Sequence, residues 1–167
     1  MRFIVVQMGA RHGYAVPAIL EGAGMLERFY TDAAAHSGLS SRLLQWVPAM
    51  GCRGVLARYA ARRVPGCIRG KTNSFAGTIF WTACRRAFGR RGPADKLREH
   101  LRWTRALGCA MAERGFGRAT HLYSTLGECG PMLVEAKRRG LIVVSEIYIL
   151  LSTERIEATE RRAFPGW

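Results

Sequence analysis

The chain has 167 residues, of which 49% are hydrophobic and 23% are charged. This is about the length of one domain, and the composition excludes a disordered or collagen-like chain, so we expect one folded core. The formal net charge is +14, and because only three of the 26 basic residues are lysines, arginine carries most of it. Guanidinium groups bind phosphate well. The charge therefore indicates a surface that binds phosphate, nucleic acid or anionic lipid headgroups. The alternative is that the organism simply uses arginine as its usual basic residue.

The cysteines indicate a reducing compartment. Their wide spacing and the lack of a CxxC pair exclude a zinc site or a disulfide framework, so we expect no bound metal. The N-terminal apolar run is short, is broken at Arg11 and has no clear cleavage site, and no segment reaches the ~18 consecutive apolar residues of a membrane span. We therefore expect a cytoplasmic protein. The five cysteines are Cys52, Cys67, Cys84, Cys109 and Cys129.

The first third of the chain predicts strand, helix, strand. Residues 2–8 are β-branched and apolar, as in a strand that is covered on both faces. A helical pattern follows, and it starts near Val16 because Pro17 is tolerated only in a first turn. Gly22 and Gly24 end the helix, and residues 26–31 predict a second strand.

The middle of the chain is mostly helical. Residues 41–63 show two apolar helical patches, and residues 71–76 predict a strand that leads into a helix over 78–88. The strongest helix covers 94–114, with charges opposite its apolar face. That face comprises Leu97, Leu101, Thr104, Leu107 and Met111.

The last third repeats the pattern of the first. Residues 119–125 predict a strand, 126–130 a turn, and 131–139 a helix that Gly140 closes. Residues 141–145 then predict a strand of the fully buried kind, and a charged helix runs from Thr153 to Arg162.

These elements predict the fold class. Strand, helix, strand at both ends implies parallel pairs with right-handed crossovers. We expect one α/β domain, with a single Rossmann-like, open, mostly parallel sheet and helices on both faces. Ligands of such sheets bind beyond the carboxyl ends of the strands, at the switch point. This rule points to the segments GARHGY at 9–14, YSTLGE at 123–128 and SEIY at 145–148.

The GARHGY loop does not fit a nucleotide fingerprint. Gly9 and Gly13 lack the G-x-G-x-x-G spacing, although Asp32 lies near the end of the second strand, and the chain has no P-loop. Arg11 and backbone N–H groups could hold an anion, and His12 could shuttle a proton or bind a hydroxyl. The alternative is that Arg11 pairs with a carboxylate and His12 is exposed to solvent.

Several segments together resemble bacterial glycosyltransferases of the family 4 type. They begin with Gly9-Ala10-Arg11 followed by Tyr14 and Pro17, and continue with AGMLERFYTD at 23–32 and RRVPG at 62–66. THLYSTLGE at 120–128, EAKRRGLIVVSE at 135–146 and the terminal ERRAFPGW complete the series. The resemblance spans nearly the whole chain in order, which makes it more specific than any single motif.

The resemblance implies one half of a GT-B enzyme. Such enzymes have two Rossmann-like domains, of which the N-terminal one binds the acceptor and the C-terminal one binds the sugar nucleotide. Residues 1–167 would be the N-terminal domain, and the terminal FPGW looks cut off. The chain alone would bind acceptor weakly and transfer no sugar. It needs no cofactor, because the nucleotide-sugar donor is a co-substrate held by the other domain.

The resemblance also assigns roles to residues at the strand ends. Gly9, Arg11, His12 and Tyr14 would line the acceptor side of the cleft. Related enzymes often carry a histidine or aspartate near the last strand of this domain, where this chain has Ser145, Glu146 and Tyr148. The departure leaves the stereochemistry open. The candidates for catalysis are His12, Glu128 and Glu146.

The second strand end has its own alternatives. Ser124, Thr125 and Glu128 could bind sugar hydroxyls, with Glu128 as a base if its pKa is raised. Equally, Thr125 could cap the following helix and Glu128 complement its dipole. His121 and Tyr123 are expected to be packing residues.

The expected partners are a saccharide or lipid-linked acceptor and a donor-binding domain in the same or a partner chain. A different class of function is a basic module that binds polyanions, either nucleic acid or an anionic membrane, with RRAFGRRG at 85–92 as its nearest motif. Both functions could be combined in one protein, which would then lie peripherally at the inner face of the membrane. The glycosyltransferase hypothesis predicts no specific binding of nucleic acid.

Overall fold

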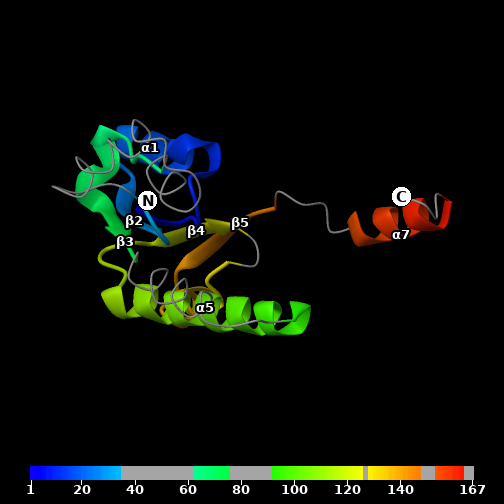
Figure 1. The fold of residues 1–167 in the computed structure, drawn as a ribbon. Coiled ribbons are helices and arrows are strands. Elements are labelled where there is room, and N and C mark those ends of the chain that lie inside the picture. Colours follow the sequence, from blue (N-terminus) through cyan, green and yellow to red (C-terminus); the bar gives the residue numbers. More distant parts are fainter. Residues whose placement is uncertain (35–61, 76–91, 126–127, 148–152, 164–167) are drawn as a thin grey trace, which may run out of the picture.

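The computed structural model describes residues 1–34, 62–75, 92–125, 128–147 and 153–163. Within them lies one sheet in which every paired neighbour is parallel, in the order β3-β2-β1-β4-β5 (Figure 1). This confirms the predicted open α/β sheet. The strands are β1 Phe3–Val6, β2 Leu26–Thr31, β3 Thr72–Ser74, β4 His121–Thr125 and β5 Ile142–Glu146.

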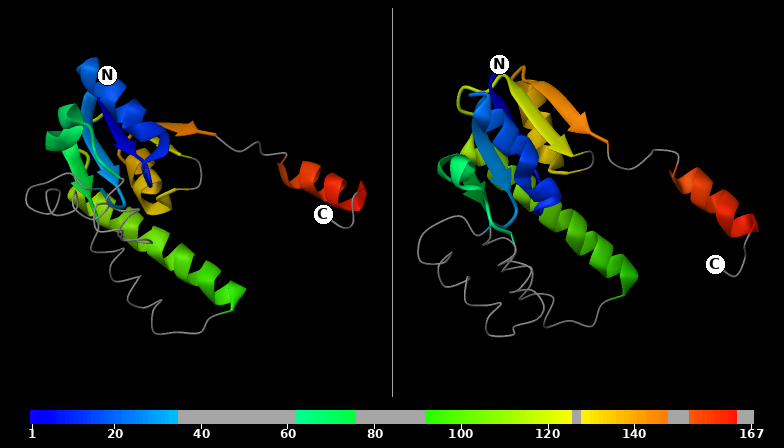
Figure 2. Two further views of the ribbon diagram at one scale, coloured as in Figure 1. Left: turned by 45° about the horizontal axis from the view of Figure 1, so that its top comes forward. Right: turned by 90° about the horizontal axis from the view of Figure 1, so that it is seen from above.

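Helices lie on both faces of this sheet, as predicted. α1 covers one face, and α5 and α6 lie on the other (Figure 1). α7 stands apart from the sheet in every view (Figures 1 and 2). Their bounds are Ala15–Gly22 for α1, Pro93–Arg114 for α5, Gly130–Arg138 for α6 and Thr153–Ala163 for α7.

The ends of the helices follow the local signals in the sequence. Pro17 lies in the first turn of α1, where backbone N–H groups have no acceptor within the helix, so its missing N–H costs no hydrogen bond. Gly140 follows α6 with a φ of 78°, a conformation that favours glycine, and its N–H donates to the Lys137 carbonyl. The predicted helices over 16–22, 94–114, 131–139 and 153–162 are therefore confirmed within two residues at either end.

Alternation along the strands builds a core on each face. Ile4 and Val6 of β1 belong to the cluster that includes Leu107 and Met111 of α5. Val5, between them, belongs to the opposite cluster with residues of β2 and of the segments around α1 and β3. β1 is thus buried on both faces, as predicted. The second cluster comprises Val5, Tyr14, Leu26, Phe29, Ala34, Val64 and Ile68.

Two predictions of burial are wrong. β5 is not fully buried, since Ile142 is 59% exposed and Val144 is 40% exposed. The strand forms the edge of the sheet, and among the described helices none covers the face that Ile142 and Val144 share. On α5, Leu97 and Leu101 are exposed, because only the C-terminal half of the helix packs on the sheet (Figure 2).

Some predictions lie outside the described residues. They are the helical patches of 41–61, the helix of 78–88 and the first two residues of the turn at 126–130. Within the described part of the chain, no helix has both the length and the apolar character needed to cross a bilayer.

Gly108 of α5 packs closely against the start of α6. A Cβ atom there would lie 2.8 Å from Cδ of Pro131 and 3.2 Å from the carbonyl of Cys129. We predict that Gly108→Ala destabilises the fold by about 1–3 kcal/mol through overpacking, although alanine normally stabilises a helix relative to glycine by about 1 kcal/mol.

Urea unfolding measures this effect. The matched control is Gly22→Ala in α1, where no atom lies within 4 Å of the new Cβ, and we expect unchanged or slightly higher stability. Equal stability of Gly108→Ala and the wild type would contradict the packing of α5 on α6.

Candidate functional site

The switch point of the sheet lies between β1 and β4. From β1 the chain crosses one face of the sheet through α1 and returns in β2. From β4 it crosses the other face through α6 and returns in β5. The chain segments beyond the two strands therefore diverge there and leave room for side chains at the carboxyl edge. The polar residues of that edge are Gly9, Arg11, His12, Asp32, Arg62, Glu128 and Glu146, which we call the carboxyl-edge site.

Glu128 joins the end of β1 to the segment after β4. Its Oε2 accepts the backbone N–H of Met8 at 3.1 Å, and its Oε1 lies 2.8 Å from Nη2 of Arg11. Glu128 is 8% exposed, so these donors compensate a carboxylate taken largely out of water.

Asp32 plays the same part from the end of β2. Its Oδ1 accepts the backbone N–H of Gly9 at 2.8 Å, and its Oδ2 lies 2.8 Å from Nη1 of Arg62. Consecutive amides of the chain after β1 thus donate to two buried carboxylates, each with its own arginine.

The GARHGY loop is held in an unusual conformation. φ is positive at His12, Gly13 and Tyr14, with values of 49°, 60° and 64°. Such a conformation is uncommon for residues other than glycine and persists only where the surroundings support it. Support comes from Gln7, whose Nε2 donates to the Arg11 carbonyl at 2.6 Å, and from Tyr14, whose ring packs edge-on against Phe29. The loop therefore projects Arg11 and His12 over the carboxyl edge while Tyr14 anchors it.

His12 faces the end of β5. Its Nε2 lies 3.7 Å from Oε1 of Glu146, whose Oε2 accepts a hydrogen bond from the Tyr123 hydroxyl at 2.7 Å. The side chain of His12 is 66% exposed. An imidazole beside an oriented carboxylate is a pair that can accept and release a proton.

Burial raises the pKa of two groups at this edge. For Glu128, burial is the largest cause, opposed by the Met8 N–H and Arg11 and reinforced by the charge of Asp32. For Tyr123, burial and the bonded Glu146 raise the pKa to about 12, so its hydroxyl remains a donor. The raised pKa makes Glu128 a stronger base than an ordinary glutamate.

The charges of the carboxyl-edge site nearly balance. Three carboxylates, those of Asp32, Glu128 and Glu146, stand against the guanidinium groups of Arg11 and Arg62. The N–H groups of Met8 and Gly9 and the guanidinium groups of Arg11 and Arg62 already contact two of these carboxylates. Of the two alternatives for the loop, the structure bears out the pairing of Arg11 with a carboxylate and the exposure of His12.

The structure separates the predicted binding residues into two groups. Gly9, Arg11, His12 and Glu128 meet at the edge, together with Glu146. Tyr14, Ser124 and Thr125 are instead buried, each at 1% exposure or less, so their side chains belong to the core.

The helix-cap alternative for Thr125 is wrong. α6 begins at Gly130, its N-cap is Cys129, and no side chain caps it. Thr125 instead bonds Glu128, which precedes the N-cap residue. His121 stacks on Phe3 and Tyr123 packs against the core, as predicted, although the bond from Tyr123 to Glu146 was not expected.

Sequence reasoning missed Asp32 and Arg62 as residues of the site. The position of Asp32 at the end of a predicted strand was a usable signal, because every parallel strand ends at the same edge. Arg62 had no such signal, since it lies in a segment without regular structure and reaches the edge only through the fold.

The hollows found among the described residues lie away from this site. One of about 480 Å³ is lined by Thr72–Phe75, Ala110, Glu113 and Arg114. Another of about 580 Å³ lies between α5 and α6, beside Pro131 and Val134. No group of three or more potential metal ligands occurs in the described ranges.

Comparisons of the chain with protein families, with curated proteins and with solved structures find no match. The resemblance to family 4 glycosyltransferases therefore rests on the sequence motifs alone.

Glu128 makes stability depend on pH. Because its pKa is raised in the folded state, its favourable contribution is complete below the ordinary value of 4.5 and is lost as pH rises through the folded pKa. We predict that wild type loses stability relative to Glu128→Gln as pH rises above the ordinary pKa of 4.5. Urea unfolding of both proteins across this range tests the sign, and a difference that stays constant or slopes the other way contradicts it.

Asp32 should be more costly to neutralise than a surface carboxylate. Asp32→Asn weakens the bonds to Gly9 and Arg62 in a buried position, and we predict a loss of about 1–3 kcal/mol. Asp95→Asn is the matched control, because Asp95 is exposed and pairs only across one helical turn with Arg98 at 3.4 Å. Thermal unfolding of both variants measures the contrast, and equal losses would show that Asp32 does not hold the loop.

Proposed function

We propose that the chain is the acceptor-binding, N-terminal domain of a glycosyltransferase of GT-B architecture. The observation that carries the proposal is the set of charged and polar groups that five chain segments bring to the carboxyl edge of a parallel sheet, around its switch point. In an open α/β sheet this is where a ligand binds. The ordered series of motifs adds support, because the segments from 9–14, 120–128 and 135–146 all end at this edge.

The chemistry of the edge suits a saccharide. Carboxylates accept hydrogen bonds from sugar hydroxyls, and guanidinium and imidazole groups donate to sugar oxygens. The near balance of Asp32 and Glu128 against their arginines favours an uncharged polyol over a strongly anionic ligand.

Two groups can take the proton that an acceptor hydroxyl loses when it attacks a sugar. Glu128 is a carboxylate with a raised pKa. His12 is an exposed imidazole with Glu146 behind it. The donor, a nucleotide sugar, would be held by the second domain in the same or a partner chain, so this chain alone is expected to transfer no sugar.

The polyanion-binding alternative would use a different surface. Most of the RRAFGRRG motif lies outside the described residues. The basic residues at the start of the strands lie at the opposite edge of the sheet from Glu128 and Arg11, so binding of a polyanion and of a saccharide would not compete.

The proposal is tested by assaying the longest product of the gene for hydrolysis or transfer of nucleotide sugars. We expect transfer to a saccharide or lipid-linked acceptor. We also expect Glu128→Gln or His12→Gln to lower kcat about 100-fold, whichever residue is the base, since general base catalysis typically contributes 10²–10⁴-fold.

Matched controls are Glu157→Gln and His100→Gln, which change the same residue types at exposed positions of α7 and α5. If the longest product neither hydrolyses nor transfers any nucleotide sugar, the glycosyltransferase proposal is wrong. If it does so and neither variant lowers kcat, the domain assignment stands and the two proton acceptors are wrong.

A further inference from the structure

The amino edge of the sheet, where the strands begin, is strongly basic. Arg2 precedes β1, Arg118 precedes β4, and the end of α6 contributes a run of three basic residues before β5. We call these residues the basic edge. They are Arg2, Arg118, Lys137, Arg138 and Arg139.

The acidic partners of the basic edge lie beneath it. Glu27 accepts from Nη1 of Arg2 at 3.2 Å and from the backbone N–H of Arg118 at 3.1 Å, and its side chain is 14% exposed. Glu135 bonds both Arg138 and Arg139. These two carboxylates therefore hold the side chains of Arg2, Arg138 and Arg139 and the backbone of Arg118. Against the five basic side chains they leave an excess of positive charge at this edge.

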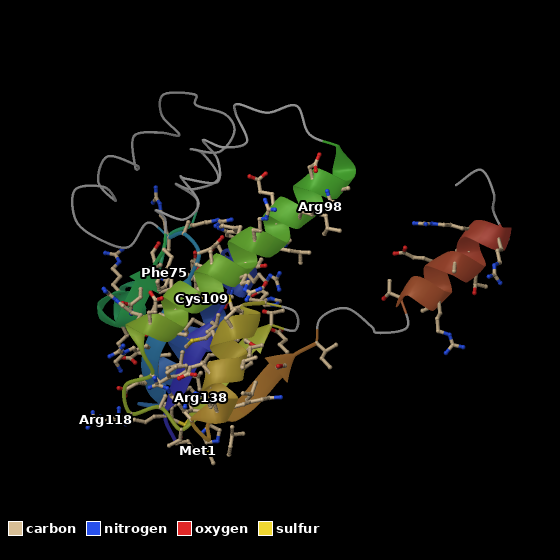
Figure 3. The ribbon with its side chains drawn as sticks, turned by 90° about the horizontal axis from the view of Figure 1, so that it is seen from below. Met1, Phe75, Arg98, Cys109, Arg118 and Arg138 are labelled. Carbon is tan, nitrogen blue, oxygen red and sulfur yellow. The ribbon has the colours of Figure 1, made fainter. Side chains whose placement is uncertain are left out.

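Exposed apolar side chains flank these cations. Met1 is 81% exposed, and Ile142, the first residue of β5, is 59% exposed. Figure 3 shows Met1, Arg118 and Arg138 at the same end of the molecule. Basic residues interleaved with exposed apolar side chains are typical of a surface that binds anionic lipid.

The aromatic residues of this edge argue against single-stranded nucleic acid. Phe116 is buried with Arg139 over its ring at 4.9 Å, and Phe3 is stacked on His121. Among the described residues of the edge, no aromatic ring is exposed for stacking on a base, which single-strand binders require.

We propose that the basic edge binds the surface of an anionic lipid bilayer. Arg118, Lys137 and Arg138 contact phosphate groups of the headgroups, while Met1 and Ile142 enter the interface. This surface is separate from the carboxyl-edge site and is independent of the reaction proposed there. Since strands of four to six residues rise about 3.3 Å per residue, the site would face away from the bilayer at a height on the order of 20 Å.

Vesicle co-sedimentation of the 167-residue chain tests the proposal, using phosphatidylcholine vesicles with and without phosphatidylserine. We expect binding only when phosphatidylserine is present. The triple variant Arg118→Gln, Lys137→Gln, Arg138→Gln should bind about 100-fold more weakly, from about 1 kcal/mol for each basic residue near the surface. Ile142→Ser should weaken binding without a change in charge.

The matched control removes the same charge from α5 through Arg98→Gln, Arg102→Gln and Arg105→Gln, and should bind as the wild type does. Thermal unfolding shows whether each variant is folded. Equal losses in the two triple variants would mean that net charge alone attracts the chain, and this would overturn the proposal. So would absence of binding to phosphatidylserine vesicles, or tighter binding of single-stranded RNA that Ile142→Ser leaves unchanged.

Discussion

Two buried carboxylates hold the end of the central strand, and the candidate site depends on them. Glu128 and Asp32 accept the N–H groups of Met8 and Gly9, where β1 leaves the sheet and its amides lose their strand partners. Each carboxylate is in turn held by an arginine. The same contacts therefore end β1, start the loop in its left-handed conformation and place Arg11 at the edge.

The two edges of the sheet differ in charge. The carboxyl edge has three carboxylates and two guanidinium groups, while the amino edge has five basic residues over two half-buried carboxylates. Among the described residues, the carboxyl edge therefore has no excess of positive charge. The nearly balanced edge suits the uncharged ligand that we propose for it, and the basic edge suits the anionic bilayer that we propose there.

The sequence predicted well what local pattern determines. Residues 26–31 match β2 without error, and Pro17 and Gly140 mark the ends of their helices, because strand alternation and helix punctuation act over a few residues. Burial was harder. The apolar run of β5 has the composition of an inner strand, but its exposure follows from its place at the edge of the sheet, which depends on the order of all five strands.

The candidate site shows the same division. The rule for strand ends located Arg11, His12, Glu128 and Glu146, since it needs only the strands. The pairing of Arg62 with Asp32 joins residues 30 positions apart and has no local signal. Tyr14 reads as a loop residue, yet its positive φ turns the ring into the core, a conformation that the spacing of residues does not encode.

The most direct test is an amide NMR titration of the chain with a neutral oligosaccharide and with its phosphorylated counterpart. The account predicts shifts at Met8–His12, Asp32, Glu128 and Glu146 with the neutral sugar, and no tighter binding there when phosphate is added. Shifts confined to the basic edge, or no shifts at any attainable sugar concentration, would contradict the assignment of the carboxyl edge as an acceptor-binding surface.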